Sequence, residues 1–202
     1  MDIDQRYATV TIVMSIAYPN LKGIVAAVAF IVTFSGSGVA EETISGDEAT
    51  LLDQLSQADP PQALRIDREL QAIWMKSGSA SADLLLARGR EALDVGDVET
   101  AIEHLTALTD HAPEFAEGWH ARASAFFGQE RYGLALADLE RALALNPSQY
   151  EAIFGLGLIF EALGRPEQAY AAYSRALSIH PHHEEVTNAV NRLKPRIEGE
   201  AL

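Results

Sequence analysis

Cysteine is absent from this chain of 202 residues. The absence excludes disulfide bonds, thiolate metal sites and cysteine nucleophiles, and it gives no indication of the redox compartment. Positive charge is scarce as well, because 15 Lys and Arg residues stand against 29 Asp and Glu residues, for a formal net charge of −14 at pH 7. A surface of this sign repels phosphate backbones and anionic membranes, so the composition disfavours nucleic-acid binding and tolerates basic or neutral protein partners.

Motifs of common enzyme classes are also missing: the chain has no nucleophile elbow, no phosphate-binding loop and no paired-histidine zinc helix. His180, His182 and His183 form a cluster with ligand chemistry, but no obvious carboxylate cage surrounds them, so we expect solvent-exposed turn histidines. The sequence therefore predicts a protein that is not an enzyme, with no catalytic residue, metal site or cofactor. The alternative is a metal-binding or enzymatic accessory protein whose site is assembled from scattered acids and histidines.

Residues 1–40 differ in composition from the rest of the chain. A short apolar run, GIVAAVAFIVTF, occupies residues 23–34, follows Lys22 and leads through small residues to Ala40. This order is typical of a secretory signal peptide, with cleavage after Ala40, and Met14 is an alternative initiator. The competing interpretation is an uncleaved inner-membrane anchor, because the segment up to Ala40 is long enough to cross ~30 Å of hydrocarbon. Either interpretation predicts a periplasmic or exported domain.

The chain repeats with a period of 34 residues, the spacing between Pro113, Pro147 and Pro181. The same spacing relates three further sets: Gly89, Ala123 and Gly157; Ala101, Ala135 and Ala169; and Leu85, Trp119 and Ile153. Within each repeat, apolar residues recur at helical spacing on both sides of a short break, which predicts two amphipathic helices. Proline then ends each second helix.

Small residues at one phase of the repeat predict close helix crossings. Glycine inside a helix costs about 1 kcal/mol relative to alanine, so its use at positions 89 and 157 needs a packing reason. We expect Gly89, Ala123 and Gly157 to admit the alanines of the facing helices, Ala101, Ala135 and Ala169. A larger side chain at these positions would separate the paired helices.

The pattern resembles the tetratricopeptide repeat (TPR). The second repeat carries the signature of large, small and aromatic residues as Trp119, Ala123, Phe126, Ala135, Leu139, Ala142 and Pro147. The resemblance implies an all-α fold, a right-handed α-α superhelix of helical hairpins, with units at 82–115, 116–149 and 150–183. It extends to exported bacterial TPR proteins. Arg88 and Arg122 stand where the family usually has leucine, and we expect Asp138 to be the partner of a buried arginine here.

Segments on both sides of the three units complete the predicted organisation. Residues 41–81 predict a degenerate helical hairpin followed by a flexible joint over residues 77–81. Residues 184–202 predict a polar capping helix to Leu193 and a tail that frays after Pro195. Such caps shield the apolar face of the last repeat.

The resemblance implies a concave groove, lined by the first helix of each unit, that holds a peptide or partner protein. The groove positions are Leu86, Arg90, His120, Phe127, Phe154 and Leu158. The lysine and asparagine that clamp a chaperone carboxylate in some family members are missing here. A hydrophobic or basic segment is therefore the expected partner, and the expected function is a non-catalytic interaction scaffold of the bacterial cell envelope. Two alternatives stay open: the apolar groove residues pack between units, or the terminal helices drive oligomerisation.

Overall fold

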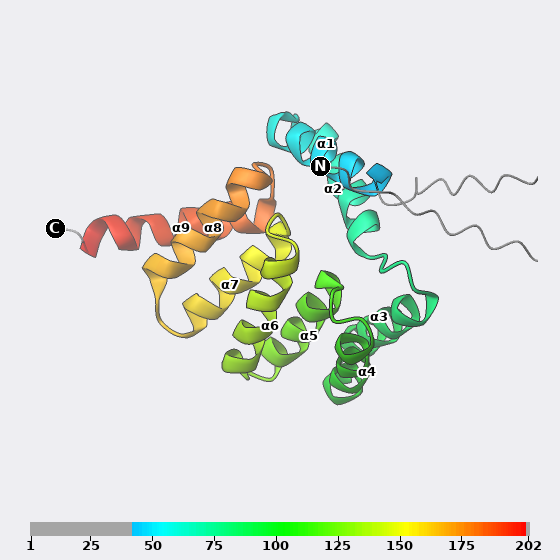
Figure 1. The fold of residues 1–202 in the computed structure, drawn as a ribbon. Helices are drawn as coiled ribbons and strands as arrows, with labels where there is room; N and C mark the ends of the chain where they lie inside the picture. The colour runs from blue at the N-terminus through cyan, green and yellow to red at the C-terminus, as the bar shows by residue number, and fades with distance from the viewer. Residues whose placement is uncertain (1–41, 201–202) are drawn as a thin grey trace, which may run out of the picture. The chain divides into compact units, whose positions relative to one another are not determined.

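The computed structural model describes the backbone of residues 42–200 and the side chains of residues 48–199. The predictions for residues 1–40, a signal peptide or anchor with cleavage after Ala40, lie outside this range. Within it the chain forms nine α-helices and no strand (Figure 1). They are α1 (Glu42–Gln57), α2 (Pro60–Trp74), α3 (Ala80–Asp94), α4 (Val98–His111), α5 (Ala116–Gly128), α6 (Tyr132–Leu145), α7 (Tyr150–Ala162), α8 (Pro166–Ile179) and α9 (Glu184–Glu200). None of these helices is both long and apolar enough to cross a bilayer.

The helices from α3 to α8 pack as three successive hairpins. Each pairs with its immediate partner, α3 with α4, α5 with α6 and α7 with α8, and each second helix also contacts the first helix of the next pair. The repeat prolines follow the ends of α4, α6 and α8 directly after the capping residues Ala112, Asn146 and His180. The predicted all-α architecture of stacked hairpins is therefore confirmed.

Two helix crossings depend on glycine. A Cβ atom on Gly89 would lie 2.5 Å from Cγ of Leu105, and one on Gly157 would lie 2.1 Å from Cε1 of Tyr173. The side chains that these glycines admit are thus Leu105 and Tyr173, and the expectation that they admit Ala101 and Ala169 was wrong. The repeat alanines Ala101, Ala135 and Ala169 are themselves fully buried.

The Arg122 guanidinium forms the buried ion pair expected from the sequence. Its Nε and Nη2 donate to the two Asp138 carboxylate oxygens at 2.7 and 2.8 Å, and Nη1 donates to Thr109 Oγ1 at 2.8 Å. The guanidinium also lies 4.9 Å from the ring centroid of Trp119. Arg88, by contrast, is exposed on α3, so its departure from the family's leucine needs no buried partner.

The N-terminal hairpin, α1 and α2, packs against helices that lie far from it in the sequence. Its apolar residues share a core with α7, α8 and α9, and none of the buried members of that core belongs to α3 or α4. The shared core contains Leu55, Ile66, Leu70 and Trp74 of the hairpin together with Tyr150, Tyr173, Val186 and Leu193. The hairpin therefore covers the third unit and does not extend the stack ahead of the first.

The segment between α2 and α3 is held by hydrogen bonds. Ser77 donates to Asp83 Oδ1 through its backbone N–H at 2.8 Å and through its hydroxyl at 2.6 Å. Ser79 caps α3 by accepting from the Ala82 N–H. Hydrogen bonds from Ser77 hold the pKa of Asp83 below its usual value. These hydrogen bonds tie Ser77 and Ser79 to the first turn of α3, within the segment where the sequence predicts a flexible joint.

The C-terminal helix α9 continues through Pro195 to Glu200, beyond the expected end. Leu193 is fully buried and Ile197 packs against the shared core. Arg192 forms a bidentate ion pair with Glu161 of α7. These contacts anchor the helix on either side of the proline.

Candidate functional site

An apolar hollow lies between α5 and α7. It has a volume of about 90 Å³. Its lining consists of His120, Ala123, Ser124, Phe127, Leu139, Gly155, Leu158 and Ile159. Leu139 belongs to α6 and is reached because Gly155 has no side chain, since a Cβ there would lie 3.2 Å from Leu139 Cδ1. Helices α5 and α7 supply most of this lining, as expected for the first helices of two successive units.

A second, more polar hollow of about 270 Å³ lies between α3 and α5. Its lining consists of Arg90, Leu93, Asp94, Glu117, His120, Ala121 and Ser124. His120 and Ser124 line both hollows, so the two are adjoining parts of one surface. This pair of hollows is called the groove below.

Glu117 lies beneath the groove and is 2% exposed. Arg90 donates to its Oε1, Gln149 Nε2 donates to its Oε2 at 2.5 Å, and His120 Nδ1 lies 3.2 Å from the same Oε2. Burial opposes ionisation, but His120 and Arg90 outweigh it and lower the pKa of Glu117. Burial likewise opposes protonation of His120, yet the Glu117 carboxylate raises the pKa of His120 above its usual value. The cluster thus favours an ionised acid among cationic partners.

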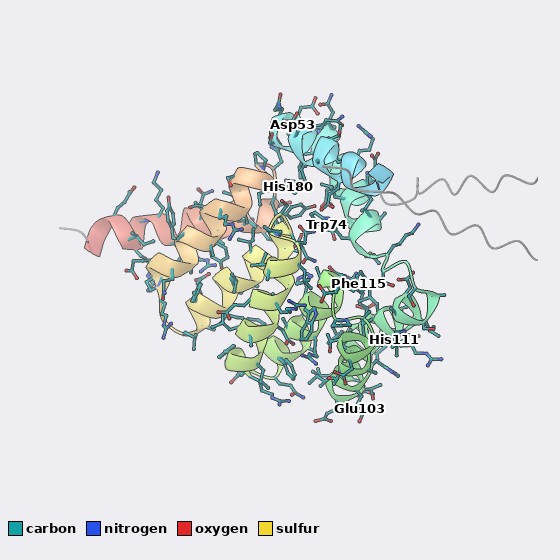
Figure 2. The ribbon with its side chains drawn as sticks, viewed as in Figure 1. Asp53, Trp74, Glu103, His111, Phe115 and His180 are labelled. Carbon is teal, nitrogen blue, oxygen red and sulfur yellow. The ribbon has the colours of Figure 1, made fainter. Side chains whose placement is uncertain are left out.

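A third hollow, called the end hollow below, adjoins the groove through Glu117. It has a volume of about 190 Å³. Its lining consists of Glu48, Ile73, Trp74, Lys76, Phe115, Ala116, Glu117, Asn146 and Gln149. The N-terminal hairpin supplies one side and the turns before α5 and α7 supply the other, so the hairpin's position on the third unit creates this hollow. Figure 2 shows Trp74 and Phe115 on these two sides.

Four of the predicted groove residues line the groove: Arg90, His120, Phe127 and Leu158. The other two are placed differently. Leu86 is 2% exposed in the core beneath α3, α4 and α5. Phe154 packs against Tyr173 and His183, at 5.5 Å between ring centroids in each case. For these two residues, packing between helices describes their environment better than a groove-facing role.

Three acids of α3 and α7, namely Asp83, Glu151 and Glu161, are engaged within the chain. Asp83 accepts from Ser77, and Glu151 lies 3.0 Å from His183 Nε2. Glu161 accepts from Arg192 and from the Tyr173 hydroxyl. None of these three acids lines the groove.

Leu139 and Ile159 were not predicted as groove residues from the sequence, and the contact between Gln149 and Glu117 was not predicted either. A glycine at position 155, inside a helix, was the available signal of close approach to Leu139. No comparable signal existed for Gln149, because its contact with Glu117 joins the ends of two different units. Long-range polar contacts of this kind have no periodicity.

The histidines after α8 are mostly buried, contrary to the expectation of exposed turn residues. His180 is 6% exposed and His183 is 7% exposed, and the Tyr150 ring packs against both, at 5.1 and 6.2 Å between ring centroids. Figure 2 shows His180 where α2 approaches this turn. His182 is exposed and its Nε2 lies 2.9 Å from the Ala58 carbonyl oxygen. Within the described part of the chain, no group of three or more His, Asp or Glu side chains is placed to hold a metal ion.

Comparison with known proteins gives consistent likenesses. The family model described as tetratricopeptide repeat matches residues 86–137 and 120–184. A TPR repeat-containing protein of Rhizobium etli is 28% identical over 166 residues, which cover 80% of this chain and 81% of the relative. The small glutamine-rich tetratricopeptide repeat-containing protein 2 of Saccharomyces cerevisiae is 32% identical over 113 residues, 56% of this chain but only 32% of the relative.

Among solved structures, the first TPR of Spaghetti (RPAP3) bound to the HSP90 peptide SRMEEVD is similar with a TM-score of 0.57 and 29% identity. The likeness covers 59% of this chain and 95% of that chain. Together with the sequence relatives, it confirms the predicted resemblance and the superhelical repeat fold.

Proposed function

Because residues 86–184 belong to the tetratricopeptide repeat family, we propose that the chain is a non-catalytic scaffold whose groove binds an apolar peptide segment of a partner protein. The observation that carries this proposal is the hollow between α5 and α7. Phe127, Leu158 and Ile159 give it an apolar lining, and His120 and Ser124 supply polar groups at its junction with the second hollow. Apolar lining with few polar groups is the usual composition of a binding pocket.

A structural neighbour supports peptide binding but differs in chemistry. The Spaghetti TPR is bound to a peptide that ends in an acidic residue. In this chain the groove cation Arg90 is already paired with Glu117, Leu86 is buried in the core, and Phe154 packs against Tyr173. An apolar anchor residue therefore fits this groove better than a terminal carboxylate.

Selection from a random library of nine-residue peptides against the full chain tests the proposal. Selected peptides should bind the Leu158→Glu variant at least tenfold more weakly, since a charge on the wall would be desolvated by an apolar anchor. Leu134→Glu is the matched control, because Leu134 is 43% exposed on α6 and does not line the groove. Equal losses of peptide affinity in both variants, or no loss of affinity in Leu158→Glu, would show that the peptides bind outside the groove.

The proposal extends to location: the scaffold acts in the bacterial cell envelope after export. The apolar run at residues 23–34 and the small residues before Glu41 support this. Mass spectrometry of the protein recovered from cells separates the possibilities. A mature chain beginning at Glu41 is the expected result, an intact N-terminus in the membrane fraction supports the anchor, and an intact chain in the cytoplasmic fraction contradicts export.

A further inference from the structure

The end hollow has an orphaned buried acceptor in its wall. Gln149 is 1% exposed, and its Nε2 donates to the Glu117 carboxylate. A carboxylate accepts hydrogen bonds, so this contact fixes which end of the amide is nitrogen. Gln149 Oε1 is consequently the free polar atom of this side chain, and within residues 48–199 it has no hydrogen-bond partner. A buried carbonyl without a donor is costly, which makes a ligand with N–H groups favourable here.

Glu48 is a second acceptor in the same lining. Its Oε1 accepts from the Trp74 indole N–H at 2.6 Å and from Asn146 Nδ2 at 3.3 Å, and both donors are neutral. Among the lining residues, Lys76 is the cation, and it is exposed. The Glu48 carboxylate therefore has neutral partners here, in contrast to Glu117, which has Arg90.

Aromatic side chains complete the lining. Trp74 is 7% exposed and contributes its indole, and Phe115 contributes a phenyl ring from the turn before α5. Aromatic faces attract cations, most strongly where water is excluded. A carboxylate with neutral partners, an orphaned carbonyl oxygen and two aromatic rings in one hollow match a single class of group, an organic cation with several N–H donors.

We propose that the end hollow binds the side chain of a lysine or arginine carried by the segment whose apolar residue occupies the groove. The inference rests on the proposed function, because the end hollow adjoins the groove through Glu117. The ammonium or guanidinium group donates to the Glu48 carboxylate and to Gln149 Oε1. The partner segment thus combines an apolar anchor with a basic residue, and the N-terminal hairpin supplies part of the specificity.

A small probe tests the end hollow without knowledge of the partner. N-acetyl-lysine methylamide is titrated into the full chain, and the indole N–H resonances of Trp74 and Trp119 are followed by NMR. The two resonances are assigned with Trp119→Phe. The lysine probe should shift the Trp74 resonance saturably, because this indole donates to Glu48, and should leave Trp119 unchanged. The uncharged N-acetyl-norleucine methylamide should shift neither resonance.

Variants connect the signal to the two acceptors. Glu48→Gln and Gln149→Met should each weaken binding of the lysine probe about tenfold, as expected for loss of a hydrogen bond to a charged group. Glu114→Gln is the control, because the Glu114 side chain is 78% exposed and lies outside the end hollow. Because Glu48→Gln changes the acceptor of the Trp74 indole N–H, the Trp74 resonance of this variant will start at a different position, and the affinity is therefore read from the titration midpoint.

Two results would overturn the proposal. The first is a Trp74 resonance that does not move up to the highest concentration of lysine probe. This result is expected if a water molecule alone donates to Gln149 Oε1. The second is an equal shift with the norleucine probe, which indicates non-specific apolar contact. If either result occurs while binding of the library peptides still depends on Leu158, the end hollow is excluded as a cation site and the proposal of peptide binding in the groove is retained. If the lysine probe binds as expected but no peptide depends on Leu158, the proposed function fails instead.

Discussion

At the scale of single residues, Gly157 and Tyr173 show why the repeat needs its small position. A Cβ on Gly157 would overlap the Tyr173 ring, which is fully buried and donates its hydroxyl to Glu161. The ring cannot move away without breaking this hydrogen bond or opening the core. The glycine is therefore required by the size of the residue opposite it.

Gly157→Ala should destabilise the protein by about 2 kcal/mol, the usual cost of overpacking a rigid core. Urea unfolding measures the change. Gly133→Ala is the matched control, since Gly133 is also helical but has open space at the Cβ position. The control should be neutral or stabilising by up to about 1 kcal/mol, and a similar loss in both variants would contradict the steric argument.

The Arg122–Asp138 pair gives a second prediction at this scale. Asp138→Ala should cost about 3–5 kcal/mol, because Arg122 would keep its charge in a mostly buried site without its carboxylate partner. Glu114→Ala, which removes the partner of Arg141 from a 41% and 78% exposed pair, should cost less than about 1 kcal/mol. Thermal and urea unfolding of both variants check the contrast.

A contact could be predicted correctly from the sequence where a residue type is stable in few environments inside a protein. A buried arginine needs a carboxylate, so Asp138 on the second helix of the same unit could be predicted as its partner. Leu86 and Phe154 were misplaced because an apolar side chain satisfies either a groove or a core, and the choice depends on neighbours such as Tyr173 and His183.

At the scale of elements, periodicity predicted the helices but not where the first hairpin packs. Each helix buries a stripe that recurs along its own sequence, so α3 to α8 could be located from apolar spacing and proline. The contacts of α1 and α2 with Tyr150 and His182 cross much of the chain, and nothing in the local pattern encodes them. The same packing of the hairpin on the third unit forms the end hollow.

His180 and His183, two neighbouring buried histidines, should change the stability of the protein with pH in opposite directions. Burial, followed by the charge of His183, lowers the pKa of His180 below 6.5, although Asp67 and Glu151 act in the other direction. Below about pH 6.5 the unfolded state therefore binds a proton that the folded state resists. The contribution of neutral His180 to stability is present above this pH and is lost as the pH falls. Wild type should accordingly lose stability relative to His180→Phe on acidification.

His183 has the opposite sign. Burial opposes its charged form, but the hydrogen bond and charge of Glu151 outweigh burial and raise its pKa above 6.5. Its stabilising contribution is complete below 6.5 and is lost as the pH rises through the folded-state pKa. His183→Phe should therefore cost more stability at acidic than at alkaline pH. Urea unfolding of both variants across pH 5–8 checks the pair, and parallel pH profiles would contradict the account.

At the scale of the whole molecule, the described repeats form a grooved surface, and a hairpin that is not part of the stack adds the end hollow to it. The groove lies between first helices of successive units, as the family resemblance implied. The end hollow forms because the N-terminal hairpin packs against residues far from it in the sequence. The sequence could therefore predict the groove but not this hollow.

The central claim is that a bound segment lies against the facing surfaces of α5 and α7. Peptides selected from the library, resynthesised with a photoreactive diazirine leucine at the apolar anchor, test it directly by cross-linking and mass spectrometry. The account predicts cross-links to Phe127, Leu158 and their neighbours in the groove. Cross-links confined to α4 or α8, which contribute no residue to the groove, would contradict it.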